Sequence, residues 1–216
     1  MLIENWMTRE VVSGTPEMSM MKASKIMKEK GVGRLPVVNE GGVLVGLVSD
    51  RDIKEASPSK ATTLDMHELY YLLSEVKLKD IMTKKVITIK TGETVDRAAQ
   101  IMLENRIGGL PVVDEQNKLV GIVTDSDVFK ALVKITGVME GGVQIGIRLP
   151  NQPGGLVPVL DYLKDHGARL MSLLTSCEPA DVGMRDVFVR IRDMDKTAMN
   201  KLKAEMCENF EVTYWV

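Results

Sequence analysis

The chain has few cysteines, histidines and aromatic residues, and each scarcity removes a class of protein. Its two cysteines, Cys177 and Cys207, have no metal-type spacing, and its two histidines, His67 and His166, lie far apart. Aromatic residues make up only 4% of the chain, whereas methionine occurs 15 times and fills irregular cores well. We therefore expect two reduced cysteines, no metal site and a cytoplasmic location.

A strong charge of either sign and a long apolar run are also missing. The formal net charge is −2, which argues against nucleic acid or a charged membrane surface as a partner. No stretch approaches the ~18 consecutive apolar residues of a membrane span. The start, MLIENWMTRE, lacks the basic and apolar regions of a secretory signal. With 44% hydrophobic and 27% charged residues, the composition indicates a globular protein.

What the chain does contain is an internal repeat. Residues 7–53 and 82–128 align without a gap, with 19 identities over 47 positions. The densest matches are RLPVV with GLPVV and LVGLVSDRDI with LVGIVTDSDV. Two copies of one unit can cover each other's apolar faces and form two related clefts.

Hydrophobic periodicity gives each copy the order β-α-β-β-α. In the first copy we expect a β-rich run at 9–14, a helix at 19–30, strands at 35–38 and 44–49, and a helix that starts at 49–52. In the second copy we expect a run at 84–89, a helix capped by Thr94, strands at 110–113 and 118–124, and a helix that starts at 124–127. An amphipathic helix is expected between the copies at 64–76, where Tyr70 and Tyr71 are more typical of a core or an interface than of a cleft.

Beyond the glycine-rich joint at 137–142 the pattern changes. Strands are expected at 143–149, 168–177, 186–192 and 211–216, with helices at 156–167 and 195–206. This β-α-β-β-α-β order is typical of a ferredoxin-like domain. A domain of this size has a small core, so docking or dimerisation would support it.

The strongest candidate site is the pair of matched strand-to-helix junctions. Gly46 to Asp52 and Gly121 to Asp127 share the pattern G-h-V-[ST]-x-x-D, where h is apolar. Backbone N–H groups at a helix start, with the hydroxyl, suit a phosphate, and the carboxylate suits both hydroxyls of a ribose. The glycine lets the strand approach the partner repeat closely. The alternative is a capping box that only starts a helix.

With these motifs, the repeats resemble CBS domains, which pair as Bateman modules. The resemblance covers residues 1–136 and implies an adenosine-nucleotide sensor. It implies that ribose and phosphate are contacted at the two junctions by Ser49, Asp52, Thr124 and Asp127. Arg51 and Ser126, which lie between these residues, are further candidate contacts. It implies that the adenine is held, copy by copy, by Val12, Leu35 and Pro36, and by Ile87, Leu110 and Pro111.

The two clefts are expected to differ in charge. The first copy carries Arg34, Arg51 and Lys54 where the second carries Gly109, Ser126 and Phe129. Because arginine binds phosphate through a bidentate fork, the first cleft should favour a longer phosphate chain. The alternative is that Arg34 and Arg51 pair with Asp50 or with other surface carboxylates.

The C-terminal segment resembles an ACT domain, a small regulatory module. The motif NQPGGL carries this resemblance, which implies an amino-acid contact at Asn151 and Gly155 and a dimer interface. The alternative is that PGGL is only a tight turn and the start of a helix. The whole arrangement is similar to bacterial accessory proteins of the acetoin-utilisation type.

The expected fold is α+β, a CBS pair followed by a ferredoxin-like ACT domain. Its segments are a first repeat (1–55), an inserted loop and helix (56–78), a second repeat (79–136), a linker (137–142) and a C-terminal domain (143–216). No catalytic constellation or catalytic cofactor is indicated, so the first hypothesis is a regulatory homodimer that senses an adenosine nucleotide, with an amino acid and an unknown target enzyme as further partners. The alternative is an interaction scaffold without a small ligand.

Overall fold

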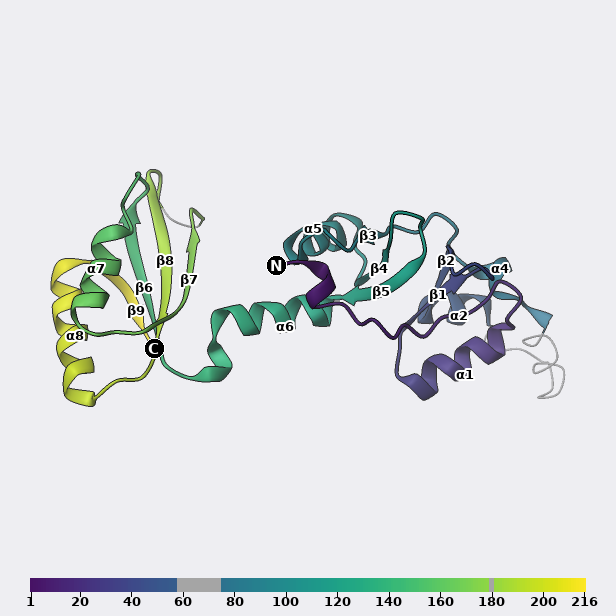
Figure 1. Ribbon diagram of the computed structural model, residues 1–216, viewed down its shortest axis with the longest axis horizontal. Helices are drawn as coiled ribbons and strands as arrows, with labels where there is room; N and C mark the ends of the chain where they lie inside the picture. Colours follow the sequence, from purple (N-terminus) through teal and green to yellow (C-terminus); the bar gives the residue numbers. More distant parts are fainter. Residues whose placement is uncertain (58–74, 179–180) are drawn as a thin grey trace. The chain divides into compact units, whose positions relative to one another are not determined.

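The computed structural model describes residues 1–57, 75–178 and 181–216, and it divides into two compact units (Figure 1). The N-terminal unit is Met1–Val128 and the C-terminal unit is Phe129–Val216. Most of the helix expected at 64–76, with His67, Tyr70 and Tyr71, lies outside the described residues. Among the residues that are described, no helix has the length and hydropathy needed to cross a bilayer.

The two repeats have the same succession of elements. The first contains α1 (Met20–Lys30), β1 (Arg34–Val38), β2 (Leu44–Ser49) and α2 (Asp50–Ala56). The second contains β3 (Ile89–Lys90), α5 (Val95–Asn105), β4 (Gly109–Val113), β5 (Leu119–Thr124) and α6 (Asp125–Thr136). A short 3-10 helix (η1, Ile3–Asn5) precedes the first repeat, and α4 (Leu78–Ile81) precedes the second.

The repeat helices begin where their capping residues predict. The Ser19 hydroxyl accepts from the Lys22 N–H at 3.3 Å, and the Thr94 hydroxyl accepts from the Arg97 N–H at 3.4 Å. The apolar stripes are buried, with Met20, Ala23 and Met27 in α1 and Val95, Ala98 and Met102 in α5. The expected helices and hairpin strands are therefore confirmed in both copies.

The β-rich runs expected at 9–14 and 84–89 are mostly wrong. Only Ile89–Lys90 forms a strand (β3), which pairs in parallel with β4. In the first copy, Gly14 forms an isolated parallel bridge with Val37. These segments pass from one sheet to the other, so their middle residues have no neighbouring strand with which to form a ladder.

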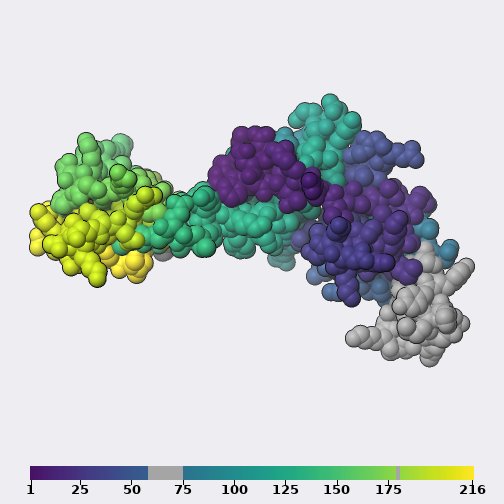
Figure 2. Space-filling model, turned by 60° about the horizontal axis from the view of Figure 1, so that its bottom comes forward, coloured from purple at the N-terminus to yellow at the C-terminus, as the bar shows by residue number. Residues whose placement is uncertain are grey.

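This crossing exchanges a segment between the two repeats. Thr8 exchanges two backbone hydrogen bonds with Ile122 of the second repeat, and Thr83 exchanges two with Leu47 of the first. Ile3 and Met7 are buried in the core of the second repeat, whereas Leu78 is buried in the core of the first. Figure 2 shows the purple N-terminal residues against the teal second repeat. Each repeat therefore completes the other's core.

The glycine of each junction makes this exchange possible. A Cβ at Gly46 would meet the Met82 sulfur, and a Cβ at Gly121 would meet the Met7 sulfur. The close approach expected of these glycines is therefore present, and it accommodates a methionine from the other repeat.

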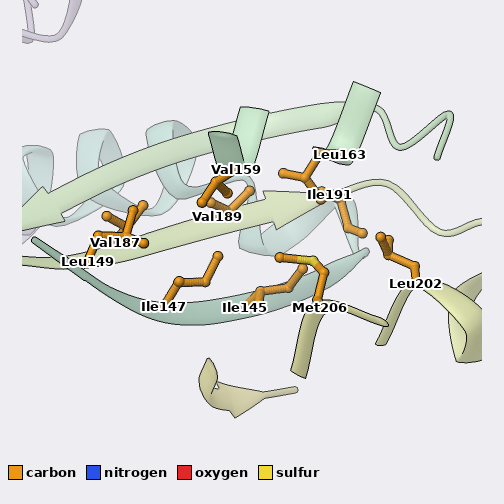
Figure 3. Packing of buried hydrophobic residues seen from close by; sticks show 10 residues of the cluster. All are labelled: Ile145, Ile147, Leu149, Val159, Leu163, Val187, Val189, Ile191, Leu202 and Met206. Carbon is orange, nitrogen blue, oxygen red and sulfur yellow. The ribbon is translucent and has the colours of Figure 1, made fainter. Parts of the chain in front are cut away.

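The C-terminal unit has the expected ferredoxin-like topology. After η2 (Val138–Glu140) come β6 (Val143–Pro150), α7 (Val157–Asp165), β7 (Leu170–Ser176), β8 (Met184–Ile191), α8 (Lys196–Asn209) and β9 (Glu211–Trp215). The four strands form one antiparallel sheet in the order β7-β8-β6-β9. Alternate residues of β6 and β8 face the two helices, and they form the core with Val159, Leu163, Leu202 and Met206 (Figure 3).

A polar cluster joins α7 to α8 at the edge of this core. His166 Nδ1 lies 2.8 Å from the Tyr162 carbonyl oxygen, and its Nε2 lies 2.8 Å from Glu205 Oε2. Because both neighbours are acceptors, both ring nitrogens are suited to carry hydrogen, as in imidazolium. The pKa of His166 is raised above its usual value by the Tyr162 carbonyl and by Glu205. The pKa of Glu205 is lowered, first by its bond with His166.

Substituting Gly46 with Ala should destabilise the N-terminal unit by ~1–3 kcal/mol, because the added methyl overpacks the site of Met82. The measurement is urea unfolding monitored by circular dichroism. Gly92→Ala is the matched control, because a Cβ there meets nothing within 4 Å. Equal stability of the two variants would show that the close contact between Gly46 and Met82 does not limit the stability of the N-terminal unit. If Gly46→Ala lowers the free energy of unfolding by less in a Met82→Ala background, Met82 is the side chain with which the added methyl clashes.

The His166 cluster predicts a pH dependence of stability. Because the folded pKa of His166 lies above its usual 6.5, the folded state favours the proton, and the stabilisation is complete below pH 6.5. The free energy of unfolding should then fall as pH rises through the folded pKa. NMR titration of the His166 ring should give a pKa above 6.5, and His166→Gln should flatten the fall in stability. A measured His166 pKa at or below its usual value would contradict the hydrogen bonds of this cluster.

Candidate functional site

The first junction forms a complete capping box. The N–H and the hydroxyl of Ser49 both donate to Asp52 Oδ2 at 2.7 Å, and the Asp52 N–H donates to Ser49 Oγ at 3.4 Å. Within the described part of the chain, the other carboxylate oxygen, Oδ1, accepts no hydrogen bond. Ser49 and Asp52 therefore start α2, and Asp52 retains one oxygen for another donor.

The second junction has the same two hydrogen bonds to its carboxylate. The N–H of Thr124 donates to Asp127 Oδ2 at 3.0 Å, and its hydroxyl donates to the same oxygen at 2.8 Å. Asp127 is buried, with 6% of its surface exposed, whereas Ser126 is exposed. The capping interpretation thus holds at both junctions. It does not exclude ligand contact at the first, where Asp52 is only half-buried.

A cavity of about 660 Å³ lies beside the first junction. The first repeat contributes Gly33, Arg34, Leu47, Ser49, Asp50, Arg51 and Asp52 to its lining. The second repeat contributes Thr83, Lys85, Val86, Ile87, Arg106, Ile107, Gly108 and Gly109. This volume is typical of sites for small organic ligands, and the lining comes from both repeats.

The structure brings Ile87 together with Ser49 and Asp52, not with the junction of its own repeat. The copy-by-copy assignment of the adenine wall is therefore wrong for Ile87. The reason is the exchanged segment, since the hydrogen bonds between Thr83 and Leu47 place residues 83–87 beside the first junction. Ile87 is 39% exposed, which leaves an apolar surface available to a flat ring.

The other wall residues are less accessible. Leu35 and Leu110 are fully buried in the cores of the first and second repeats, so their assignment to a ligand wall is wrong. Strand alternation explains this, because Leu35 pairs with the buried Val48. Val12 packs against the core of the first repeat. Pro36 and Pro111 are buried opposite Leu47 and Ile122.

The cavity lining carries an excess of positive charge. Its cationic residues are Arg34, Arg51, Lys85 and Arg106, and its acidic residues are Asp50 and Asp52. Within residues 1–57, 75–178 and 181–216, none of these four cationic side chains forms a salt bridge. The expected alternative, in which Arg34 and Arg51 are neutralised by carboxylates, is therefore wrong for the described residues. Lys54 is not among the residues that line the cavity.

Two cationic residues of this site, Lys85 and Arg106, were not identified from the sequence. Both belong to the second repeat but line the cavity beside the first junction. The repeat alignment contained a signal, because it places Lys85 opposite Glu10 and Arg106 opposite Gly31. The cavity lining shows which cleft these two differences affect, and the exchange of residues 83–87 explains it for Lys85.

The candidate ligand residues of the C-terminal unit lie at the end of β6. The Asn151 N–H donates to the Gly183 carbonyl at 2.8 Å, and the Gly155 N–H donates to the Gln152 carbonyl at 3.1 Å. Asn151 is exposed, and its Nδ2 lies 3.6 Å from Cys177 Sγ. Both residues therefore have structural roles in this turn, and their contact with an amino acid stays a prediction.

Comparison with known proteins identifies the repeats. The model of the CBS domain family matches residues 3–59 and 78–134. The uncharacterized protein MJ1225 of Methanocaldococcus jannaschii is 37% identical over 130 residues, which cover 60% of this chain and 46% of that protein. The chain thus spans less than half the length of this relative.

Two solved structures show the same likeness. CBSX2 in complex with AMP is 32% identical, with a TM-score of 0.52, over 62% of this chain and 97% of that one. A structure from Vibrio cholerae, described as an acetoin utilization protein (AcuB), is 27% identical, with a TM-score of 0.54, over 65% of this chain and 96% of that one. The expected CBS pair is confirmed, and the likeness to the acetoin-utilisation type is confirmed for 65% of the chain; the likeness of the whole arrangement stays a prediction. The ACT identity of the C-terminal unit stays a prediction.

Proposed function

The chain belongs to the CBS domain family, and we propose that its N-terminal unit is a regulatory module that binds an adenosine-containing ligand in the cavity beside Ser49 and Asp52. The observation that carries this proposal is that both repeats line one cavity, which holds a carboxylate with an unused oxygen and unpaired cationic side chains. The likeness to CBSX2, whose structure contains AMP, supports the same class of ligand.

Each part of such a ligand has a counterpart in the lining. Oδ1 of Asp52 is an acceptor for a ribose hydroxyl, because Ser49 occupies only Oδ2. Leu47 and Ile87 offer apolar surface to the adenine ring. Arg51, next to Asp52, offers a planar cation to the first phosphate. These roles involve binding, and none requires a nucleophile or a general base.

Binding in this cavity would act on the arrangement of the repeats. A ligand held by residues of both repeats stabilises the relative orientation that it fits best. Ligand concentration then changes the shape that the N-terminal unit presents to a target enzyme. The matched junction at Thr124 and Asp127 is the second candidate site of the pair, and binding there stays a prediction.

We also propose that the C-terminal unit is a second regulatory and dimerisation domain in a cytoplasmic homodimer. Its ferredoxin-like sheet and the exposed Asn151 at the end of β6 support this role. The ligand would be an amino acid, held near Asn151 and Gly155.

Substituting Asp52 with Asn should weaken AMP binding at the first site by about 10–100-fold, because it removes a charge-assisted hydrogen bond of ~1.5–3 kcal/mol. Isothermal titration calorimetry measures the effect. Asp80→Asn is the matched control, because Asp80 also accepts a helix-capping bond, from the Lys77 N–H at 3.1 Å, and does not line the cavity.

Thermal-shift measurements, together with these titrations, separate the sensor from the scaffold. A sensor gains thermal stability from AMP, adenosine or S-adenosylmethionine, since a ligand that binds only the folded state raises its stability. If none of these shifts the melting temperature, and Asp52→Asn behaves like Asp80→Asn, the scaffold is the better description.

Native mass spectrometry of the full chain should show a dimer, and added amino acids should bind with a stoichiometry that Asn151→Ala reduces. The dimer mass must persist in the Asn151→Ala variant, because a variant that fails to assemble cannot report on the ligand. A monomer at micromolar concentration would overturn the dimer proposal, and an unchanged mass with every amino acid tested would overturn the second ligand.

A further inference from the structure

A second cavity, of about 320 Å³, lies wholly within the C-terminal unit. Its lining comes from the end of α6, from the joint at 137–142, from the start of β7 and from the residue that follows β8. Because β8 runs antiparallel to β6, this is the end of the sheet opposite to Asn151, which follows β6. The cavity is therefore separate from the candidate amino-acid site.

The lining of this cavity carries an excess of positive charge. Its charged residues are Lys134, Arg169, Arg192 and Glu140, three cations and one carboxylate. Lys134 Nζ lies 3.1 Å from Glu140 Oε1, so these two charges neutralise each other. Across residues 1–57, 75–178 and 181–216, neither of the two exposed arginines has a side-chain hydrogen bond or a salt bridge. Asp193, the residue after Arg192, does not line the cavity. Both arginines therefore remain available to an anion.

The two arginines lie opposite each other on neighbouring strands. The Arg192 N–H donates to the Arg169 carbonyl at 2.9 Å, directly beyond the paired residues Leu170 and Ile191 of β7 and β8. Like charges directly opposite each other destabilise a sheet. The residue types at these exposed positions therefore oppose the stability of the sheet unless an anion lies between the two guanidinium groups.

A third arginine adds positive charge beside the cavity. Arg190 is only 9% exposed, and its guanidinium donates to the carbonyls of Gly141 and Gly142 at 3.2 and 3.3 Å and to Gln144 Oε1 at 3.4 Å. These acceptors are neutral, and among the described residues its Nε has no partner and no carboxylate forms a salt bridge with it. Buried charges are normally paired with an opposite charge. A Cβ on Gly137, which lines the cavity, would lie 3.5 Å from Arg190 Cδ, so this uncompensated charge adjoins the cavity.

We propose that this cavity binds the phosphate group of a small phosphorylated metabolite between Arg169 and Arg192. A guanidinium group donates two parallel hydrogen bonds to a pair of phosphate oxygens, and two opposed arginines can share the oxygens of one dianion. The bound charge would remove the repulsion between the arginines and compensate Arg190. The inference does not depend on the adenosine site, because every lining residue belongs to the C-terminal unit.

The cavity also has room for the rest of such a molecule. Its volume lies at the lower end of the range typical of small-molecule sites. Leu170, which is 50% exposed, and Met171 give the lining an apolar part. Because the lining includes Gly137 of the joint as well as residues of the sheet, a ligand here would hold the joint against the C-terminal sheet.

Titration of the full chain with inorganic phosphate, followed by proton–nitrogen NMR correlation spectra, locates the site. The amide signals of the lining residues Gly137 and Leu170 should shift together as phosphate is added. Arg169→Gln and Arg192→Gln should each weaken this binding by about tenfold, the loss of one charge-assisted contact. Lys164→Gln is the matched control, because it removes an exposed positive charge from α7 at a residue that does not line the cavity.

Thermal unfolding separates binding from folding. Without phosphate, the melting temperature of Arg192→Gln should equal or exceed that of the parent protein, because the substitution removes the repulsion between like charges. With phosphate, the parent should gain stability and Arg192→Gln should gain less, since a ligand stabilises only the state that it binds. A lower melting temperature of Arg192→Gln without phosphate would show that Arg192 stabilises the sheet and would contradict the inference.

The outcomes distinguish this inference from the proposed function. If phosphate shifts neither Gly137 nor Leu170, or if Lys164→Gln weakens binding as much as Arg192→Gln does, the cavity is no phosphate site. If succinate shifts the same signals at lower concentration than phosphate, the ligand is a dicarboxylate and the phosphate assignment is wrong. Asp52→Asn should leave these shifts unchanged, so each of the two proposals can fail without the other.

Discussion

The exchange of one short segment between the repeats is the constraint on which the N-terminal unit depends. Met7 lies against Gly121 of the second repeat, and Met82 lies against Gly46 of the first. Paired backbone hydrogen bonds at Thr8 and Thr83 fix the register of both contacts. Because each crossing segment leaves its own repeat and then returns, it lines a space between the repeats. The cavity beside Ser49 is a direct result, since residues 83–87 supply one of its sides.

Much of the fold could be predicted from the sequence. Hydrophobic periodicity located the helices and hairpin strands of both repeats, and Ser19 and Thr94 located two helix starts, because these signals are local. The topology of the C-terminal sheet also followed from element order, since β-α-β-β-α-β has few compact arrangements. The segments at 9–14 and 84–89 were predicted wrongly because their β-rich composition does not determine which sheet each end joins. That choice depends on contacts with residues far away in the chain.

The candidate site was predicted less completely for the same reason. The repeated pattern identified Ser49, Asp52, Thr124 and Asp127, and the structure shows each pair as a hydrogen-bonded cap. Strand alternation could not separate Leu35 and Leu110 from Pro36 and Pro111, because both faces of the LPVV strands are apolar. Ile87 and Lys85 could be assigned to the first junction only with knowledge of the exchanged segment, and Arg106 only with knowledge of the cavity lining. Sequence comparison of the repeats showed which positions differ, and the structure showed which cleft the difference affects.

The exchanged segment also means that the unit of repetition is not the unit of folding. A fragment that ended at residue 57 would retain every residue of the first copy of the repeat. It would nevertheless lack Leu78 and Met82, which complete the core of that half. It would also carry Ile3 and Met7 with nothing to cover them, since their burial is in the other half. Neither copy is an independent domain, and any boundary drawn for excision, fusion or permutation has to keep the pair intact.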